Sequence, residues 1–203
     1  MDNQVDTKRI TRISKTMSWI LRHGINELGL KIDELGRIPL KTLLEQTQMK
    51  DLNVLESEVI QVVQTNDKQR FRLDLVGETL WIGANQGHSK DVGEKISTDK
   101  LMELITEPVD LCVHGTYSKF IDSIKKTGLK SMGRTHIHMA TGFAGDHCVI
   151  SGARSSANVF IKIDMKSAMD DGIKFYRSSN GVILSEGIDG TIEPKYFLDI
   201  IYK

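Results

Sequence analysis

The stretch RFRLDLVGETLWIGAN, residues 70–85, decides the architecture of the first half of the chain. Apolar Phe71, Leu73 and Leu75 alternate with charged residues, which is the two-residue period of a half-buried strand. Gly77 then reverses the chain, and the apolar segment Leu-Trp-Ile returns. Alternation, a glycine turn and an apolar return together predict a β-hairpin.

Three helical patterns precede this hairpin. Residues 8–23 place isoleucine, leucine and methionine at helical spacing, a second pattern follows Pro39, and a third covers residues 54–67. Three helices followed by a hairpin predict a winged-helix module, a fold that does not by itself imply nucleic-acid binding. Residues 87–98 are polar and contain two glycines, so they read as a linker, and we expect the first domain over residues 1–92.

The second half, residues 93–203, predicts an α+β domain of short strands with a few helices. The segments DLCVHGT, HIHMAT, ANVFIKIDM and YFLDIIYK read as strands, and FIDSIKKTGL reads as a helix that ends at Gly128. The segments FYRS and GVILSEG are expected to pair around a turn at Ser179-Asn180-Gly181.

The bulk composition narrows the classes of function. The 27 basic and 27 acidic residues balance, so no basic lobe is available to grip a long duplex, and a nucleic-acid role needs a local cluster of cations. No apolar run approaches a membrane span, and the polar N-terminus lacks a signal-peptide core. Cys112 and Cys148 lie in apolar stretches and read as buried thiols in a reducing compartment, so we expect a cytoplasmic protein. The small size and zero net charge of the chain suit a monomer.

The segment SWILRHG ends the first helix on Arg22 and His23, directly before Gly24. One interpretation is a helix end, where both cations complement the helix dipole and Gly24 supplies a left-handed cap. The other is a phosphate site, because a guanidinium offers forked donors that match phosphate oxygens. Arg70 and Arg154, each near the start of a strand, extend this cationic set, although a lone arginine is usually a solvated surface group.

The second half also carries polar groups suited to a nucleotide. His114 lies at a strand end beside Gly115, where the missing side chain lets a ligand approach the backbone, and Thr116 and Ser118 add hydroxyls. The alternative is a strand-to-helix turn in which Thr116 or Ser118 caps the helix. Neither a GxxxxGK[ST] loop nor a GxGxxG after a strand is present, so a nucleotide would be bound by another device.

In GRTHIHMATG, His136 and His138 lie two residues apart and therefore share one face of a strand, with Ile137 toward the core. A histidine pair also suits a metal ion, but no acidic or cysteine partner lies nearby in the sequence. We therefore expect no metal and favour histidines that line a nucleotide site.

Seven segments, in order, resemble the NAD⁺-dependent RNA 2′-phosphotransferases, which remove a 2′-phosphate from spliced tRNA during RNA processing. They are SKTMSWILRHG, DELGRIPLKTLL, NDKQRF, ANQGHS, VHGTYSKFIDSIKKTGLKSMGRTHIHMATG, ISGARSSANVFIKID and GVILSEGIDGTIEPKYF. The resemblance covers nearly the whole chain. It implies a winged-helix RNA lobe over residues 1–92 and an ADP-ribosyltransferase-like, NAD⁺-binding lobe over residues 93–203.

The resemblance also implies which residues act. The catalytic positions of the family fall on Arg22, His23, Arg70 and Arg154. The positions implied to hold NAD⁺ are His114, Gly115, Thr116, Ser118, Arg134, His136, His138 and Val182. Many protein-modifying relatives carry an acid at the position of Val182. The valine of this chain resembles the RNA-directed branch instead. One position departs from the pattern: arginine is expected before ANQGHS, and the chain has Gly83, so substrate binding would weaken unless Arg72 compensates.

The implied reaction has two steps. The RNA 2′-phosphate attacks the anomeric carbon of the nicotinamide ribose and expels nicotinamide. The ribose 2″-hydroxyl then attacks the phosphorus, which releases 2′-OH RNA and ADP-ribose 1″,2″-cyclic phosphate. His23 would act as a general acid or as a hydrogen-bond donor to the phosphate. Two other functions stay open: an ADP-ribosyltransferase acting on phosphorylated nucleic-acid ends, and a non-catalytic NAD-sensing module that binds nucleic acid.

Overall fold

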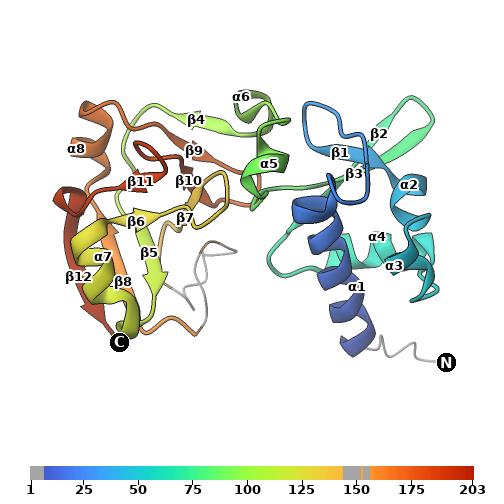
Figure 1. Cartoon of the computed structure of the whole chain (residues 1–203), viewed down its shortest axis with the longest axis horizontal. Coiled ribbons are helices and arrows are strands. Elements are labelled where there is room, and N and C mark those ends of the chain that lie inside the picture. Colours follow the sequence, from blue (N-terminus) through green and yellow to red (C-terminus); the bar gives the residue numbers. More distant parts are fainter. Residues whose placement is uncertain (1–6, 144–151, 153–155) are drawn as a thin grey trace. The chain divides into compact units, whose positions relative to one another are not determined.

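The computed structural model describes residues 7–143, 152 and 156–203, and the chain divides into two compact units, Met1–Ser97 and Thr98–Lys203 (Figure 1). We call these unit 1 and unit 2. Both combine helices with small antiparallel sheets, in agreement with the predicted α+β class. No helix in the described part of the chain is long and apolar enough to cross a membrane.

The helices of unit 1 include the three that the sequence predicts, which are α1, α2 and α4. The helices are α1 (Thr7–Trp19), which continues into a π-helical turn η1 (Ile20–Gly24), then α2 (Leu40–Leu44), α3 (Thr47–Lys50), α4 (Glu56–Thr65) and α5 (Lys90–Gly93). The short helices α3 and α5 were not expected from the sequence pattern. The apolar stripe of the first helix is buried as predicted, because Ile13, Met17, Ile20 and Leu21 are at most 1% exposed.

The sheet of unit 1 contains the predicted hairpin. Strands β2 (Phe71–Val76) and β3 (Thr79–Ala84) pair antiparallel, and Gly77 adopts a φ of 61° in the turn between them. A further strand, β1 (Arg37–Pro39), pairs with the other edge of β3, which gives the order β1-β3-β2. Across this sheet, Arg37 and Arg72 both lie opposite Gly83.

Residues 87–98 do not form the linker that their composition suggests. Val92 of α5 is fully buried in the core of unit 1, and the side chain of His88 is 4% exposed. The backbone N–H of Ser97 donates to the carbonyl oxygen of Glu34 at 2.8 Å. The segment up to Ser97 therefore belongs to unit 1, so the prediction of a linker is wrong.

Unit 2 contains three sheets within the described residues. Their strand orders are β4-β9-β10-β7, β12-β8-β5 and β11-β6, all antiparallel. The strands are β4 (Glu103–Ile105), β5 (Val113–Thr116), β6 (Leu129–Lys130), β7 (Ile137–Met139), β8 (Val159–Ile163), β9 (Phe175–Arg177), β10 (Ile183–Ser185), β11 (Thr191–Ile192) and β12 (Phe197–Tyr202). The helices are α6 (Thr98–Leu101), η2 (Ser118–Phe120), α7 (Ile121–Thr127), α8 (Met165–Asp170) and η3 (Pro194–Tyr196).

Two links in unit 2 bear on the predictions. Strand β9 pairs with β10 through Arg177 and Ile183, and Gly181 has a φ of 77° in the turn, which confirms the expected pairing. Val113 and Ala140 exchange two backbone hydrogen bonds of 2.9 Å, so the end of β7 is tied to β5.

Cys112, just before β5, is 1% exposed, and burial raises the pKa of its thiol to about 12, as expected of a buried thiol. Cys148 lies outside the described residues.

Candidate active site

Arg22 and His23 lie on η1, the last turn of the first helix. On this turn Ile20 and Leu21 are fully buried, whereas Arg22 is half-buried and His23 is exposed. A π-turn shifts the register of the side chains that follow it and is a frequent feature of functional sites. The apolar residues of the turn therefore anchor it in the core, while the side chain of His23 is exposed and the Nε atom of Arg22 is buried.

Gly24 does not cap this helix. It belongs to the helical turn and has no positive φ, and a Cβ atom there would lie 2.9 Å from Cζ3 of Trp19. The left-handed residue is Gly29, with a φ of 63°; its N–H donates to Asn26 and the N–H of Leu30 donates to Ile25, as in a Schellman motif. The interpretation of Gly24 as a left-handed cap is wrong, because the glycine is required by the indole that packs on it.

Arg70 is held just before β2 by a side chain from the end of α4. Asn66 Oδ1 accepts hydrogen bonds of 3.3 Å from both the backbone N–H and Nη1 of Arg70. Asn66 Nδ2 donates in turn to Ser14 Oγ on α1 at 3.3 Å. Arg70 is half-buried, so its guanidinium is restrained on one side.

The ANQGHS loop, residues 84–89, brings the segments of the two arginines together in unit 1. The backbone N–H of Asn85 donates to the carbonyl oxygen of Arg70 at 2.9 Å. The backbone N–H and the hydroxyl of Ser89 donate to the carbonyl oxygen of Arg22 at 2.9 Å and 3.0 Å. Local sequence does not predict this role of the loop, because its contacts join residues far apart in the chain. Only the family resemblance draws attention to the segment.

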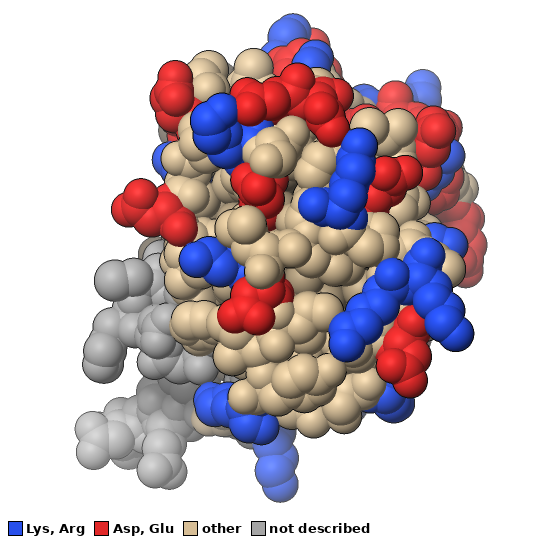
Figure 2. All heavy atoms as spheres, turned by 90° about the vertical axis from the view of Figure 1, so that its left-hand side faces the viewer, with Lys and Arg blue, Asp and Glu red and all other residues tan. Residues whose placement is uncertain are grey.

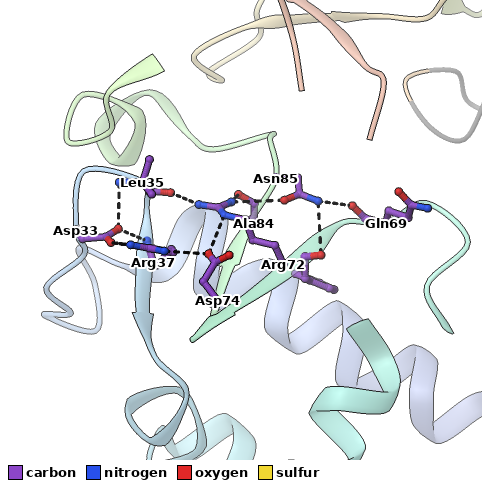
Figure 3. A network of polar contacts seen from close by, with 9 residues as sticks. Asp33, Leu35, Arg37, Gln69, Arg72, Asp74, Ala84 and Asn85 are labelled. Atoms are coloured by element: carbon purple, nitrogen blue, oxygen red, sulfur yellow. Dashed lines mark hydrogen bonds and ion pairs between the residues drawn. The ribbon is translucent and has the colours of Figure 1, made fainter. Parts of the chain in front are cut away.

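Arg72, the residue that would compensate for Gly83, makes several bonds within unit 1. Its guanidinium donates to the carbonyl oxygens of Leu35 and Ala84 and lies 3.4 Å from the carboxylate of Asp74 (Figure 3). Burial lowers the pKa of Arg72, and the nearby carboxylate opposes this shift. The guanidinium of Arg72 is therefore bonded within unit 1, and its compensation for Gly83 at the substrate stays a prediction.

In unit 2, His114 lies on β5 with a defined ring orientation. Its Nδ1 atom is 2.8 Å from the carbonyl oxygen of His138, and a carbonyl oxygen only accepts, so Nδ1 carries the proton. Gly115 follows on the same strand, and Thr116 is buried. Ser118 accepts at its hydroxyl from Asn158 at 3.3 Å, and its backbone N–H donates to Asn158 at 3.0 Å. These bonds hold the turn after β5.

His136 and His138 share one face of the four-stranded sheet. His138 lies opposite Leu184, which lies opposite Tyr176, and the ring of His136 packs edge-on to Tyr176 at 6.2 Å. Ile137 faces the core, as predicted. His136 is 5% exposed, and this burial lowers its pKa to about 4, although the exposed carboxylate of Glu186 lies 3.6 Å from Nε2. His136 is therefore neutral near pH 7.

The other residues implied for NAD⁺ lie in unit 2 with the histidines. Arg134 is half-buried in the turn before β7, where its backbone N–H donates to Ser131 at 3.2 Å. Val182 is fully buried, and its N–H donates to Ser178 Oγ at 3.1 Å in the turn between β9 and β10. Arg154 lies outside the described residues. Across the described segments, no three His, Cys, Asp or Glu side chains gather closely enough to hold a metal ion.

Comparison with known proteins places the chain among transferases that act on RNA. A family model described as RNA 2′-phosphotransferase, Tpt1 / KptA family, matches residues 8–187. The chain belongs to this family, as its seven segments predict.

Named relatives agree with this match. The chain is 44% identical over 198 residues to tRNA 2′-phosphotransferase 1 of Homo sapiens, covering 95% of the chain and 76% of that protein. It is 41% identical over 201 residues to tRNA 2′-phosphotransferase 1 of Danio rerio, covering 96% and 87%. It is 37% identical over 187 residues to tRNA 2′-phosphotransferase of Saccharomyces cerevisiae, covering 89% and 80%.

Proposed function

We propose that this protein transfers the 2′-phosphate of an RNA, of the kind left by tRNA splicing, to NAD⁺ through an ADP-ribosylated RNA intermediate. The products are nicotinamide, ADP-ribose 1″,2″-cyclic phosphate and 2′-OH RNA. The observation that carries the proposal is the family match, which spans both units. The placement of cations in unit 1 and of histidines in unit 2 supports it.

We assign unit 1 as the winged-helix RNA lobe and unit 2 as the ADP-ribosyltransferase-like lobe, close to the division expected from the sequence at residues 92 and 93. Three helices followed by the β2–β3 hairpin support the first assignment. Short antiparallel strands with few helices support the second. Figure 2 looks onto unit 2, where acidic and basic side chains are intermingled.

NAD⁺ fits the donor and acceptor set of β5 and β7. With Nδ1 of His114 donating to a backbone carbonyl, the neutral ring has its lone pair on Nε2, which suits a ribose hydroxyl. Gly115 lets a ligand approach the strand, and His138, whose Nδ1 is bonded to the carbonyl of His136 at 3.0 Å, is oriented in the same way. NAD⁺ supplies an electrophilic anomeric carbon and a leaving group that needs little acid assistance. The remaining members of the NAD⁺ set are Thr116, Ser118, Arg134, His136 and Val182.

The cations of the family positions are assigned to the phosphate. Charge builds on the phosphate oxygens when the 2″-hydroxyl attacks the phosphorus, and preorganised donors stabilise that charge. Arg22 and Arg70 are restrained by bonds to their backbones and by Asn66, and Arg154 completes the set. His23, which is exposed on η1, acts as a general acid or as a hydrogen-bond donor to the phosphate.

The proposal is tested by incubating the protein with NAD⁺ and a short RNA carrying one internal 2′-phosphate. Release of nicotinamide together with the cyclic phosphate supports it, and the same RNA with a 2′-hydroxyl is the control. A stable ADP-ribosylated RNA would instead indicate a transferase acting on phosphorylated ends, and unchanged NAD⁺ would indicate a non-catalytic module. The monomeric state and cytoplasmic location stay predictions; light scattering measures the first.

A further inference from the structure

The loop of residues 84–89 is polar and yet buried. Asn85, Gln86 and His88 are 5%, 4% and 4% exposed. Burying amides and imidazoles costs free energy unless their hydrogen bonds are made, so such a loop is retained where its bonds fix something. The bonds of Asn85 identify what it fixes.

Asn85 donates hydrogen bonds to the backbone at Arg70 and at its two neighbours. Its backbone N–H donates to the carbonyl oxygen of Arg70 at 2.9 Å. Its Nδ2 donates to the carbonyl oxygens of Gln69 at 2.6 Å and Phe71 at 3.5 Å, the residues on either side of Arg70. Gln69 has a φ of 43°, a conformation that costs a non-glycine residue free energy and therefore needs such support.

The orientation of the Asn85 amide is itself fixed. Arg72 Nη1 donates to the carbonyl oxygen of Ala84 at 2.8 Å and lies 3.5 Å from Asn85 Oδ1. Figure 3 shows the resulting row, in which Arg72 meets the oxygen of the amide and Gln69 meets its nitrogen. A guanidinium only donates, so it directs the Oδ1 atom toward itself and the two N–H donors of the amide toward the backbone around Arg70.

The far end of the same loop holds Arg22. Ser89 donates twice to the Arg22 carbonyl oxygen, and Gly87, with a φ of 87°, passes the guanidinium so closely that a Cβ would lie 3.4 Å from its Cζ. Three residues separate Asn85 from Ser89, so the Cα atoms of these two residues lie at most about 14 Å apart. One short loop therefore fixes the backbones of both arginines.

We propose that Asn85 is a positioning residue that sets the place of the Arg70 guanidinium relative to Arg22 for phosphate transfer. The inference rests on the proposed function. Asn85 makes no chemical step; it acts through the backbone of Arg70.

The test compares Asn85→Asp with Asp74→Asn. The aspartate keeps the shape of Asn85 and an acceptor for Arg72, but it cannot donate to the carbonyls of Gln69 and Phe71. Asp74 belongs to the same network, where it bonds Arg37 at 3.0 Å and Arg72 at 3.4 Å, so its variant is the matched control. For N85D we expect kcat on the 2′-phosphorylated RNA to fall about 10- to 100-fold, with the KM for NAD⁺ within about threefold. D74N should lower the unfolding temperature and keep kcat within about threefold of wild type.

A second readout does not depend on activity. Hydrogen exchange over residues 66–72 should accelerate in N85D and stay unchanged in D74N. The inference is overturned if N85D keeps both the kcat and the hydrogen exchange of wild type. It is also overturned if kcat falls in N85D and D74N in proportion to their loss of stability. If wild type forms no product, the proposed function fails, and exchange alone decides the positioning role. Asn85→Ala replaces N85D if the aspartate prevents folding; unfolding of both variants also overturns the inference.

Discussion

The Nδ1 atom of His114 lies 2.8 Å from the backbone oxygen of His138. This bond joins β5 to β7 next to the pair of backbone bonds between Val113 and Ala140. Because the carbonyl can only accept, the imidazole turns its N–H inward and leaves Nε2 as an acceptor in the neutral ring. A role in holding NAD⁺ therefore depends on one nitrogen of His114, and the other has a structural role.

Replacing His114 with asparagine separates these two nitrogens. The asparagine amide can still donate to the His138 carbonyl, but no acceptor remains where Nε2 was. We expect His114→Asn to keep its free energy of unfolding and to bind NAD⁺ about tenfold more weakly, the cost of about one good hydrogen bond. Calorimetric titration with NAD⁺ measures this. His114→Gln, whose amide reaches further, should recover part of the affinity; equal affinity in wild type and His114→Asn would contradict the assignment.

Arg22 contributes to the fold through its backbone and to the proposed chemistry through its side chain. Its carbonyl oxygen accepts both bonds from Ser89, and these survive truncation of the side chain. Arg22→Ala should therefore change the free energy of unfolding by less than about 1 kcal/mol. Its rate of phosphate transfer should fall by about 100-fold or more, as for loss of a preorganised donor. Urea unfolding and single-turnover assays measure the two quantities.

Arg9→Ala is the opposite case and the control for Arg22→Ala. Arg9 pairs with Glu58 through two bonds, one of 2.8 Å, and so joins α1 to α4. Its loss should cost about 1 kcal/mol of stability, since Arg9 is part-exposed, and leave the rate unchanged. An unfolded Arg22→Ala variant would show that the helix end is structural.

Two glycines near this helix end differ in what they require. Gly24→Ala places a methyl 2.9 Å from the Trp19 ring and should cost about 1–3 kcal/mol and lower kcat, because the turn carrying Arg22 must shift. Gly29→Ala meets open space, so only its φ of 63° is unfavourable; it should cost about 1 kcal/mol and keep kcat. Thermal unfolding and steady-state rates of both variants decide this. A Gly24→Ala variant as active as Gly29→Ala would argue against a role for the packed turn.

The buried imidazole of His136 sets the direction in which the free energy of unfolding changes with pH. Its pKa is about 4 in the folded protein and 6.5 when unperturbed, so between these values the unfolded chain binds more protons. Stability should be fully present above about pH 6.5 and should fall by about 2–3 kcal/mol by about pH 4.5 from this group. His136→Phe keeps an aromatic ring against Tyr176 and removes that part of the loss. Urea unfolding of both proteins at the two pH values measures the difference; an identical pH dependence would exclude His136 as its source.

The parts of the fold that depend on local pattern were predictable. The hairpin of β2 and β3 follows from alternation and Gly77, and α1 and α4 follow from apolar spacing. The role of Gly24 was not, because a glycine after a helix is usually a cap, and only the indole of Trp19 reveals that it is a packing residue. Local sequence does not report such contacts.

The candidate site shows the same division. The residue types of Arg22, Arg70 and His114 point to phosphate and nucleotide chemistry, and family resemblance assigns them. Asn85 and Ser89 fall in a stretch whose later part reads as a polar linker, yet they bond to carbonyls of residues 14 or more positions away. Every residue carries a backbone carbonyl, so the sequence does not indicate which carbonyl accepts a hydrogen bond. These positioning contacts can therefore be identified only in the folded chain.

Gly83 and Arg72 provide the sharpest chain-specific prediction. A Cβ at position 83 would lie 3.0 Å from Arg37 Cγ and 3.1 Å from Arg72 Nη2, so the guanidinium of Arg72 occupies the space over this glycine. Gly83→Arg introduces the arginine that the family resemblance implies here, and it should displace Arg72 from its carbonyl partners and cost about 1–3 kcal/mol. In the double variant Gly83→Arg, Arg72→Ser the space is vacated, so the two costs should fall short of additivity by about 1 kcal/mol or more. A double-mutant cycle from urea unfolding measures this coupling. Strict additivity would mean that Gly83 accommodates a side chain without moving Arg72.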